Sequence, residues 1–199
     1  MIQSELSEFL DASAPYKQGF KASDIGHSLY EIIDGDEPLH PIIDFDLPVE
    51  ILDVITSKLL YKQAKNLLCC AFKDTCLEIS TEWDKETMSI AESSDKKKIS
   101  LHVLIFGMKL SNIAKVSVFT ELVYKKLPVE LQKKSIIDNI ANISSFRSFS
   151  LRMLGSPKYN EKTEEHICVK KAIRPKDGTI FDFMIHPLIM ILKSLIVLF

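Results

Sequence analysis

Apolar residues follow two different periods along the chain, and these periods predict a mixture of helices and strands. Apolar positions three or four residues apart predict helices over residues 1–14, 48–60 and 112–126. Alternating apolar and polar positions predict strands over residues 28–33, 40–47, 75–81, 88–90, 99–106, 148–154 and 167–173. Because strands and helices do not alternate strictly, the pattern favours an α+β fold.

Turn-forming and capping residues separate these elements. Asp34–Asp36, with glycine in the middle, ends the first strand, and Asp177-Gly178 marks a tight turn late in the chain. Asn112 is placed to cap the helix that follows it. Leu127-Pro128 breaks that helix. From there to Ile143 the sequence is compatible with a second helix or with irregular structure.

A length of 199 residues suits one domain. We expect this domain to span residues 1–187, with an N-terminal αβ unit over about 1–95 and a sheet over about 96–187. Residues 188–199 form a short apolar tail that Lys193 interrupts. A bilayer-spanning helix takes about 20 apolar residues. A buried helix or a truncated reading frame therefore explains the tail better than a membrane anchor, and we expect no stable membrane insertion.

The cysteines point to a reducing compartment. The chain has four, and none forms the Cys-x-x-Cys pair typical of zinc and redox sites. Adjacent Cys69 and Cys70 fall in an apolar helical stretch, which predicts buried thiols. The polar, acidic first residues lack the pattern of a signal peptide. We therefore expect an intracellular protein, nuclear or cytoplasmic.

Charge is distributed unevenly along the sequence although the net charge is only −2. Residues 1–95 carry 7 basic and 19 acidic side chains, a net of −12, whereas residues 96–176 carry 17 basic and 6 acidic, a net of +11. A basic half of this kind is compatible with a surface that meets polyanions. The alternative is that both halves are ordinary solvated faces that mix in three dimensions, as is common on soluble proteins.

Two acidic residues interrupt one of the most apolar predicted strands. Asp44 and Asp46 lie in the run Ile42–Leu47, and on a strand both carboxylates point to the same face. Two like charges on an apolar strand are costly unless something neutralises them. Carboxylate pairs suit Mg²⁺ or Mn²⁺. The alternative is a surface edge strand that tolerates both acids without a metal.

A second polar set lies on the predicted strand that begins near Ile99. Lys98, Ser100 and His102 share one face of this strand, and the apolar residues between them share the other. Ammonium, hydroxyl and imidazole groups can all donate hydrogen bonds to phosphate oxygens. The alternative is a half-exposed strand whose outer face is polar by chance.

A third set follows later in the chain. Arg152 lies on a predicted strand and Lys158 follows the turn after it, so both side chains can converge on an anion. Asp138, upstream of them, is a third candidate carboxylate. Ordinary surface charge explains each of these residues taken alone.

The order of these sets resembles the catalytic core of the archaeo-eukaryotic primase superfamily, within it the primase-polymerase and large-DNA-virus primase branch. The family's hydrophobic-Asp-hydrophobic-Asp/Glu motif matches Ile43–Asp46, and its Lys-hydrophobic-Ser-x-His motif matches Lys98–His102. Its following Asp and its "R-L-x-x-S-x-K"-like stretch match Asp138 and Arg152–Lys158. The gap between these last two is a few residues longer than the family pattern. The resemblance covers about residues 28–187.

The resemblance implies an α+β core with a mixed or antiparallel, RRM-like sheet flanked by helices. It also implies a DNA primase or primase-polymerase, a nucleotidyltransferase that adds nucleotides to a 3′-hydroxyl on single-stranded DNA by two-metal catalysis. The implied cofactor is Mg²⁺ or Mn²⁺, with nucleoside triphosphates as substrates. The implied site comprises Asp44, Asp46 and Asp138 for the cations and Lys98, Ser100, His102, Arg152 and Lys158 for the triphosphate. His102 fits the role of a hydrogen-bond donor to a phosphate better than that of a general base.

Further expectations and alternatives accompany this interpretation. The sequence has no G-x-x-x-x-G-K-[ST] motif, so we expect that either a helicase is a separate chain or the gene is shortened. A viral replication site is one location compatible with the resemblance. One alternative is a degenerate primase-like domain that binds nucleotide or single-stranded nucleic acid without catalysis. Another is an unrelated α+β interaction domain in which the motifs are accidental.

Overall fold

A five-stranded sheet forms the centre of the molecule. The computed structural model describes residues 30–54, 61–132, 136–138, 148–160, 165–186 and 195–197, so the helix predicted over residues 1–14 lies outside the described part. The sheet has the strand order β10-β3-β4-β2-β6, and every neighbouring pair is antiparallel. Its strands are β2 (Ile42–Pro48), β3 (Met88–Glu92), β4 (Lys98–Ile105), β6 (Ile137–Asp138) and β10 (Lys171–Arg174).

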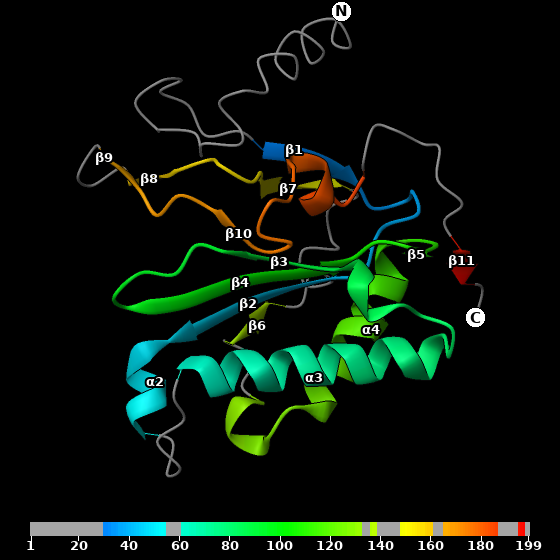
Figure 1. Ribbon diagram of the computed structural model, residues 1–199, viewed down its shortest axis with the longest axis horizontal. Coiled ribbons are helices and arrows are strands. Elements are labelled where there is room, and N and C mark those ends of the chain that lie inside the picture. Colours follow the sequence, from blue (N-terminus) through cyan, green and yellow to red (C-terminus); the bar gives the residue numbers. More distant parts are fainter. Residues whose placement is uncertain are drawn as a thin grey trace, which may run out of the picture.

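Two long helices cover one face of this sheet (Figure 1). The helices are α2 (Val49–Val54), α3 (Tyr61–Ile79) and α4 (Ile113–Lys126), with short turns of 3₁₀ helix at η2 (Lys85–Thr87), η3 (Val129–Leu131) and η5 (Ile180–Phe183). In chain order β2, α3, β3, β4, α4 and β6 give the succession β-α-β-β-α-β, and the four strands stand in the order β6-β2-β4-β3. This is the split β-α-β arrangement. The sheet thus takes strands both from the expected N-terminal unit, about residues 1–95, and from the expected sheet region, about residues 96–187.

Smaller strand pairs complete the molecule. β1 (Tyr30–Asp34) pairs antiparallel with β7 (Ser148–Arg152), and Figure 1 shows them over the sheet face opposite the long helices. The other pairs are antiparallel β8 (Lys158–Asn160) with β9 (Glu165–Ile167), and parallel β5 (Met108–Leu110) with β11 (Leu195–Val197). Antiparallel sheets with helices packed on one face confirm the α+β class.

Alternation along β2 separates the core from the candidate site. Phe45 is fully buried among the apolar residues of the core, whereas its neighbours Asp44 and Asp46 are only partly buried. Between the covering helices, Phe72 of α3 meets Phe119 of α4 edge to face, with ring centroids 5.1 Å apart. Because successive strand residues point to opposite faces, the two aspartates face the β1–β7 layer.

Residues 75–81, predicted as a strand, are helical up to Ile79, so this prediction is wrong. The buried face of α3 continues into that stretch through Thr75 and Cys76, which follow Phe72 at helical spacing. The Thr75 hydroxyl donates a 2.9 Å hydrogen bond to the Ala71 carbonyl one turn earlier. Packing along a whole helix therefore overrode a short alternation of apolar and polar residues.

The strand predicted over residues 167–173 is two strands. Cys168 adopts a left-handed backbone conformation with φ of 53°, and this bend separates β9 from β10. The region between Leu127 and Ile143, predicted as helical or irregular, contributes η3 and the two-residue strand β6. The sequence pattern also missed β5, directly after Gly107, whose φ of 82° makes the tight reversal.

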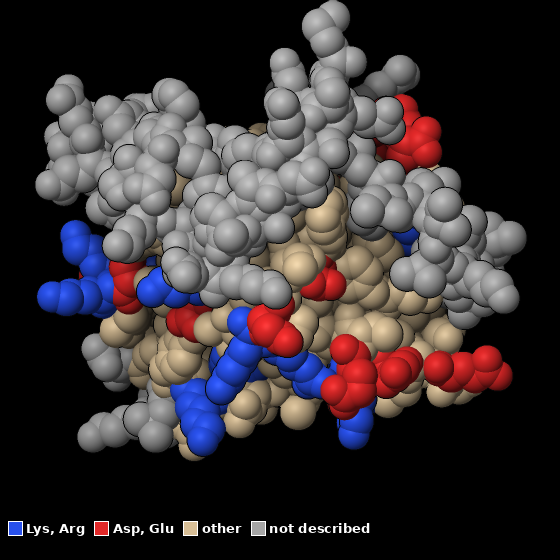
Figure 2. Space-filling view, turned by 45° about the horizontal axis from the view of Figure 1, so that its top comes forward, with Lys and Arg blue, Asp and Glu red and all other residues tan. Residues whose placement is uncertain are grey.

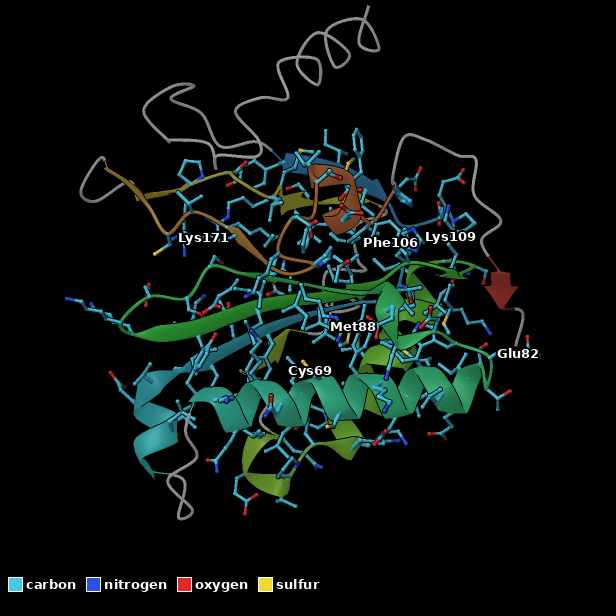
Figure 3. The ribbon with its side chains drawn as sticks, in the orientation of Figure 1. Cys69, Glu82, Met88, Phe106, Lys109 and Lys171 are labelled. Atoms are coloured by element: carbon cyan, nitrogen blue, oxygen red, sulfur yellow. The ribbon has the colours of Figure 1, made fainter. Side chains whose placement is uncertain are left out.

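Two further predictions need correction. Within the apolar tail, residues 195–197 form the strand β11, so a helix over them is wrong. Of the adjacent cysteines predicted to be buried, Cys70 is exposed and Cys69, labelled in Figure 3, packs only partly against the core. The fully buried thiol of α3 is that of Cys76. Among the described helices, none has the length and apolar character needed to cross a membrane.

Removing the cap of α4 tests how its start is specified. The Asn112 side chain accepts a 3.1 Å hydrogen bond from the Lys115 backbone N–H, as the sequence predicted. We expect Asn112→Ala to lower the free energy of unfolding by about 1 kcal/mol. Urea denaturation measures this, with Asn112→Asp as the control because aspartate can accept the same bond. Equal losses in both variants would contradict the capping role.

Candidate functional site

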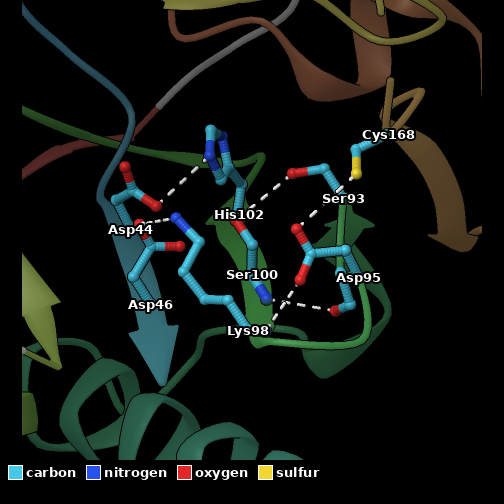
Figure 4. A network of polar contacts seen from close by, with 9 residues as sticks. Asp44, Asp46, Ser93, Asp95, Lys98, Ser100, His102 and Cys168 are labelled. Atoms are coloured by element: carbon cyan, nitrogen blue, oxygen red, sulfur yellow. Dashed lines mark hydrogen bonds and ion pairs between the residues drawn. The ribbon is translucent and has the colours of Figure 1, made fainter. Parts of the chain in front are cut away.

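The first two predicted motifs face each other across β2 and β4. The register pairs Asp44 with His102, Asp46 with Ser100, and Pro48 with Lys98. Residues directly opposite in an antiparallel pair lie on the same face. His102 Nε2 is 3.3 Å from Asp44 Oδ1, and Lys98 Nζ is 2.6 Å from Asp46 Oδ2 (Figure 4). The acids and donors thus contact one another directly.

The third candidate carboxylate lies on the other neighbour of β2. The register of β2 and β6 pairs Asp138 with Asp44, and the Asp46 N–H donates a 2.7 Å hydrogen bond to the Ile136 carbonyl. Asp44 is therefore flanked at one level of the sheet by the backbone of His102 on β4 and that of Asp138 on β6. Segments separated by tens of residues in sequence meet there on three adjacent strands.

The predicted basic residues of the third set occupy different environments. Arg152 ends β7, and its Nη1 donates a 2.8 Å hydrogen bond to the Cys168 carbonyl. Burial lowers the pKa of Arg152, while nearby groups that include Asp44 and Asp46 act in the opposite direction. Lys158 is exposed at the start of β8. Its convergence with Arg152 on one anion stays a prediction.

A loop holds Lys98 at the edge of the site. Asp95 accepts hydrogen bonds from the backbone N–H groups of Lys97 and Lys98, at 2.7 and 2.8 Å. The bond from Lys97 is the largest influence and, together with that from Lys98, lowers the pKa of Asp95 against the opposing effect of burial. The hydroxyl of Ser93, directly after β3, lies 3.2 Å from that of Ser100 on β4 (Figure 4). The two hydrogen bonds to Asp95 thereby fix the backbone from which the Lys98 side chain extends.

The polar face of β4 is covered, which the sequence did not indicate. Ser100 and His102 are only 6% and 7% exposed. A half-exposed strand with a solvated outer face is therefore the wrong interpretation for these two residues. The β1–β7 layer and the segment before β10 provide the cover, since Lys170 contacts both His102 and the backbone of Arg152.

Lys170 is a site residue that sequence reasoning missed. It is 3% exposed, and its Nζ lies 2.7 Å from His102 Nδ1 and 2.6 Å from the Arg152 carbonyl oxygen. The available signal was the pair Lys170-Lys171 inside a predicted strand, because alternation places one of two successive side chains inward. Lys171, the exposed member, is labelled at the start of β10 in Figure 3.

Glu31 is the second residue that was missed. It lies on β1, is 7% exposed, and accepts hydrogen bonds from the backbone N–H groups of Ile185 and His186, at 2.9 and 2.5 Å. Burial raises the pKa of Glu31, and those two bonds and the charge of Lys170 oppose the rise. Glu31 therefore partly balances the charge of Lys170 from the opposite layer.

The protonation states of the central groups follow from these contacts. Burial opposes ionisation of Asp44, but His102, Lys170 and Lys98 outweigh it and hold the pKa of Asp44 below its ordinary value. Burial, together with the charge of Lys170, lowers the pKa of His102 despite the attraction of Asp44. The site at neutral pH therefore contains a carboxylate beside a neutral imidazole.

Asp44 and Asp46 are the candidate ligands for a divalent cation. Asp46 Oδ1 is buried and accepts no hydrogen bond from a described donor, and Asp44 Oδ1 is buried with His102 Nε2 as its polar neighbour at 3.3 Å. Buried carboxylate oxygens without donors are costly unless a cation is bound. Within the described part of the chain no three His, Cys, Asp or Glu side chains gather as a metal site, and the side chain of Asp138 lies outside that part. The residues that would hold the cation are Asp44 and Asp46, with Asp138 as the expected third ligand.

The surface carries charges of both signs. Figure 2 shows lysine and arginine side chains beside aspartate and glutamate side chains on the described part of this face. The acidic and basic halves of the sequence thus meet in space, because β2 and β4 are neighbours in one sheet. This agrees with the interpretation that charges of the two halves mix on this face.

Comparison of the sequence with models of known protein families and with curated proteins gave no match. What is established is therefore the α+β class, its antiparallel sheets and the geometry of the polar cluster between two layers.

The buried amine of Lys170 predicts a pH dependence of stability. Burial is the largest influence on this amine and brings its pKa down from 10.5 to about 7. Between these values the unfolded chain binds more protons than the folded one, so the free energy of unfolding rises with pH. Chemical denaturation at several pH values should show this rise in the wild type and in Lys171→Met, and a smaller one in Lys170→Met. The same pH dependence in all three proteins would contradict the burial of this amine.

Proposed function

We propose that this protein is a metal-dependent nucleotidyltransferase of the DNA primase and primase-polymerase type. The observation that carries the proposal is the register of three strands, which sets Asp44 between His102 and Asp138. The antiparallel sheet with the order β6-β2-β4-β3 and its two covering helices also supports it, because the resembled family is expected to have an RRM-like core of this kind. Function still rests on the site, since one fold can host many activities.

The residues divide the work between cations and phosphates. Asp44 and Asp46, together with Asp138, would hold Mg²⁺ or Mn²⁺ through hard oxygen ligands. When bound, such ions lower the pKa of an attacking hydroxyl and stabilise the attacking and leaving oxygens. Lys98 is 36% exposed in its side chain, so its ammonium can turn from Asp46 toward a phosphate oxygen. His102 would donate to a phosphate oxygen through Nε2, which lies 3.3 Å from Asp44 Oδ1, and Ser100 lies between Lys98 and His102 along β4.

The proposed substrates are nucleoside triphosphates and a single-stranded DNA template with a 3′-hydroxyl. Basic side chains such as Arg152 and Lys158 would contact phosphates, a kind of contact that positions nucleic acid without reading its sequence. We propose an intracellular location at a site of DNA replication, cellular or viral.

Metal-dependent primer extension tests this proposal. The purified chain is incubated with a primed single-stranded template, labelled deoxynucleotides, and either Mg²⁺ or Mn²⁺. We expect template-directed extension that a chelator abolishes and that added metal restores. Asp36→Asn, which changes an exposed aspartate in the turn after β1, is the control for substitutions of the acids in the site. If the folded wild type incorporates no nucleotide with either metal, the proposed activity is contradicted.

One observation favours a second candidate, a primase-like domain that binds nucleotide without catalysis. In the structure both acids already have basic neighbours, since Lys98 pairs with Asp46 and His102 with Asp44. The Lys98–Asp46 pair reduces the negative charge available to a cation, and His102 lies where it can compete for Asp44. Calorimetric titration with a deoxynucleotide and Mn²⁺ distinguishes the candidates, because binding without incorporation identifies the second.

A further inference from the structure

Lys170 joins the two layers that carry the proposed site. It lies just before β10, yet its side chain reaches His102 on β4 and the backbone of Arg152 at the end of β7. Its own backbone is fixed as well, because its N–H donates to the Ser156 carbonyl at 3.2 Å and its carbonyl accepts from the Gly155 N–H at 2.8 Å. The lysine is therefore held at both ends.

The contacts of His102 determine which of its ring nitrogens carries the proton. Nε2 lies 3.3 Å from a carboxylate oxygen of Asp44, so an unprotonated Nε2 would set two acceptors against each other. The proton of the neutral ring therefore belongs on Nε2. Nδ1 then has a lone pair, which accepts a hydrogen bond from Lys170 Nζ at 2.7 Å. A lysine amine can donate this bond whether or not it is charged.

We infer that Lys170 is a positioning residue that holds the His102 ring with its Nε2–H directed toward Asp44, and that it fixes the end of β7 relative to His102. The first part of the inference stands on the two contacts of the ring alone, Nδ1 with Lys170 Nζ at 2.7 Å and Nε2 with Asp44 Oδ1 at 3.3 Å. Its consequence for catalysis rests on the proposed function, because His102 and Arg152 are the groups that would contact the triphosphate. Partners that orient a functional histidine through its second nitrogen are a general device in active sites.

Charged groups from both layers act on Lys170. Asp44 on β2 and Glu31 on β1 attract it, and Arg152 on β7 repels it. Lys170 is thus surrounded by one acid from each layer, and it donates to an imidazole nitrogen and a carbonyl oxygen. Its neighbour Lys171 is exposed and provides a matched control in the next position of the chain.

Three variants separate the hydrogen bonds from the rest of the side chain. Lys170→Met keeps the length and the apolar stem and removes both donated bonds. Lys170→Gln keeps an N–H donor for His102 Nδ1 and removes the charge. Lys171→Met removes an exposed ammonium and leaves the site unchanged. Unfolding by urea confirms for each variant that the chain is folded before other measurements are made.

Nitrogen-15 NMR of the histidine side chains tests the inference without any activity assay. The His102 signals are assigned by their loss in His102→Asn. In the wild type, and in Lys171→Met, we expect Nε2 protonated and Nδ1 unprotonated at neutral pH. In Lys170→Met we expect a proton on Nδ1 in a substantial part of the molecules, and in Lys170→Gln we expect the wild-type pattern. Unchanged His102 signals in folded Lys170→Met would overturn the inference.

The wild-type spectrum alone keeps the inference falsifiable when Lys170→Met does not fold, because a protonated Nδ1 in the wild type overturns it. Primer extension then tests the consequence. We expect Lys170→Met to lower the rate about tenfold, Lys170→Gln to lower it less, and Lys171→Met to leave it unchanged. If the wild type incorporates no nucleotide but the NMR pattern is found, the proposed function fails and the positioning role stands. If extension occurs but the NMR pattern is absent, the reverse holds.

Discussion

Asp44→Asn is expected to lower the rate of nucleotide incorporation by at least about 10²-fold. Asparagine has nearly the shape of aspartate but lacks the negative charge that would hold a divalent cation. Asp44 is also the residue that the register sets between His102 and Asp138, so its position is central to the proposed site. Primer extension with Mn²⁺ at saturating nucleotide measures the loss, and circular dichroism confirms that the variant is folded.

The control for this substitution is Asp36→Asn. Asp36 is exposed in the turn after β1, and the same chemical change there should leave incorporation within about twofold of the wild type, as expected for a surface position. Equal activity of Asp44→Asn and the wild type would show that the acidic pair does not serve the reaction. Equal loss in both variants would show that the assay responds to net charge instead of the site.

Phe45→Ala, one residue further along β2, is expected to have its effect on stability. Phe45 is fully buried and belongs to the apolar core, on the face of the sheet opposite the aspartates. Truncating a buried phenylalanine costs about 3–5 kcal/mol because it removes apolar contacts and leaves a cavity. The free energy of unfolding, measured by urea denaturation, should fall by that amount.

A matched apolar truncation on the surface completes this test. Val118 lies on α4 and is 56% exposed, so Val118→Ala should change the free energy of unfolding by less than about 0.5 kcal/mol. A small loss in Phe45→Ala, similar to that in Val118→Ala, would mean that β2 is not packed as the structure shows. The assignment of its other face to the site would then lose its basis.

The sequence was sufficient for the elements that carry the candidate site. β2 and β4 alternate clearly between apolar and polar residues, so their faces could be predicted and their antiparallel register then sets Asp44 beside His102. The start of α4 was equally specific, because Asn112 precedes a stretch with helical spacing. Local signals of this kind arise from backbone geometry and capping, which depend on few distant contacts.

What the sequence could not show depends on contacts between distant segments. Alternation after Thr75 resembled a strand, and only the packing of Thr75 and Cys76 against the core extends the helix through it. The residue types of Lys170 and Glu31 give no sign of burial, since lysine and glutamate are usually exposed. Their positions follow from the β1–β7 layer, which closes over the sheet and brings in residues from both ends of the described chain.

The most direct test of the central claim is a crystal structure of the protein with Mn²⁺ and a non-hydrolysable deoxynucleoside triphosphate. The account predicts anomalous density for manganese about 2.1 Å from carboxylate oxygens of Asp44 and Asp46. It also predicts phosphate oxygens within hydrogen-bonding distance of Lys98 and His102. Manganese bound elsewhere, or a triphosphate away from this face of β2 and β4, would contradict the account.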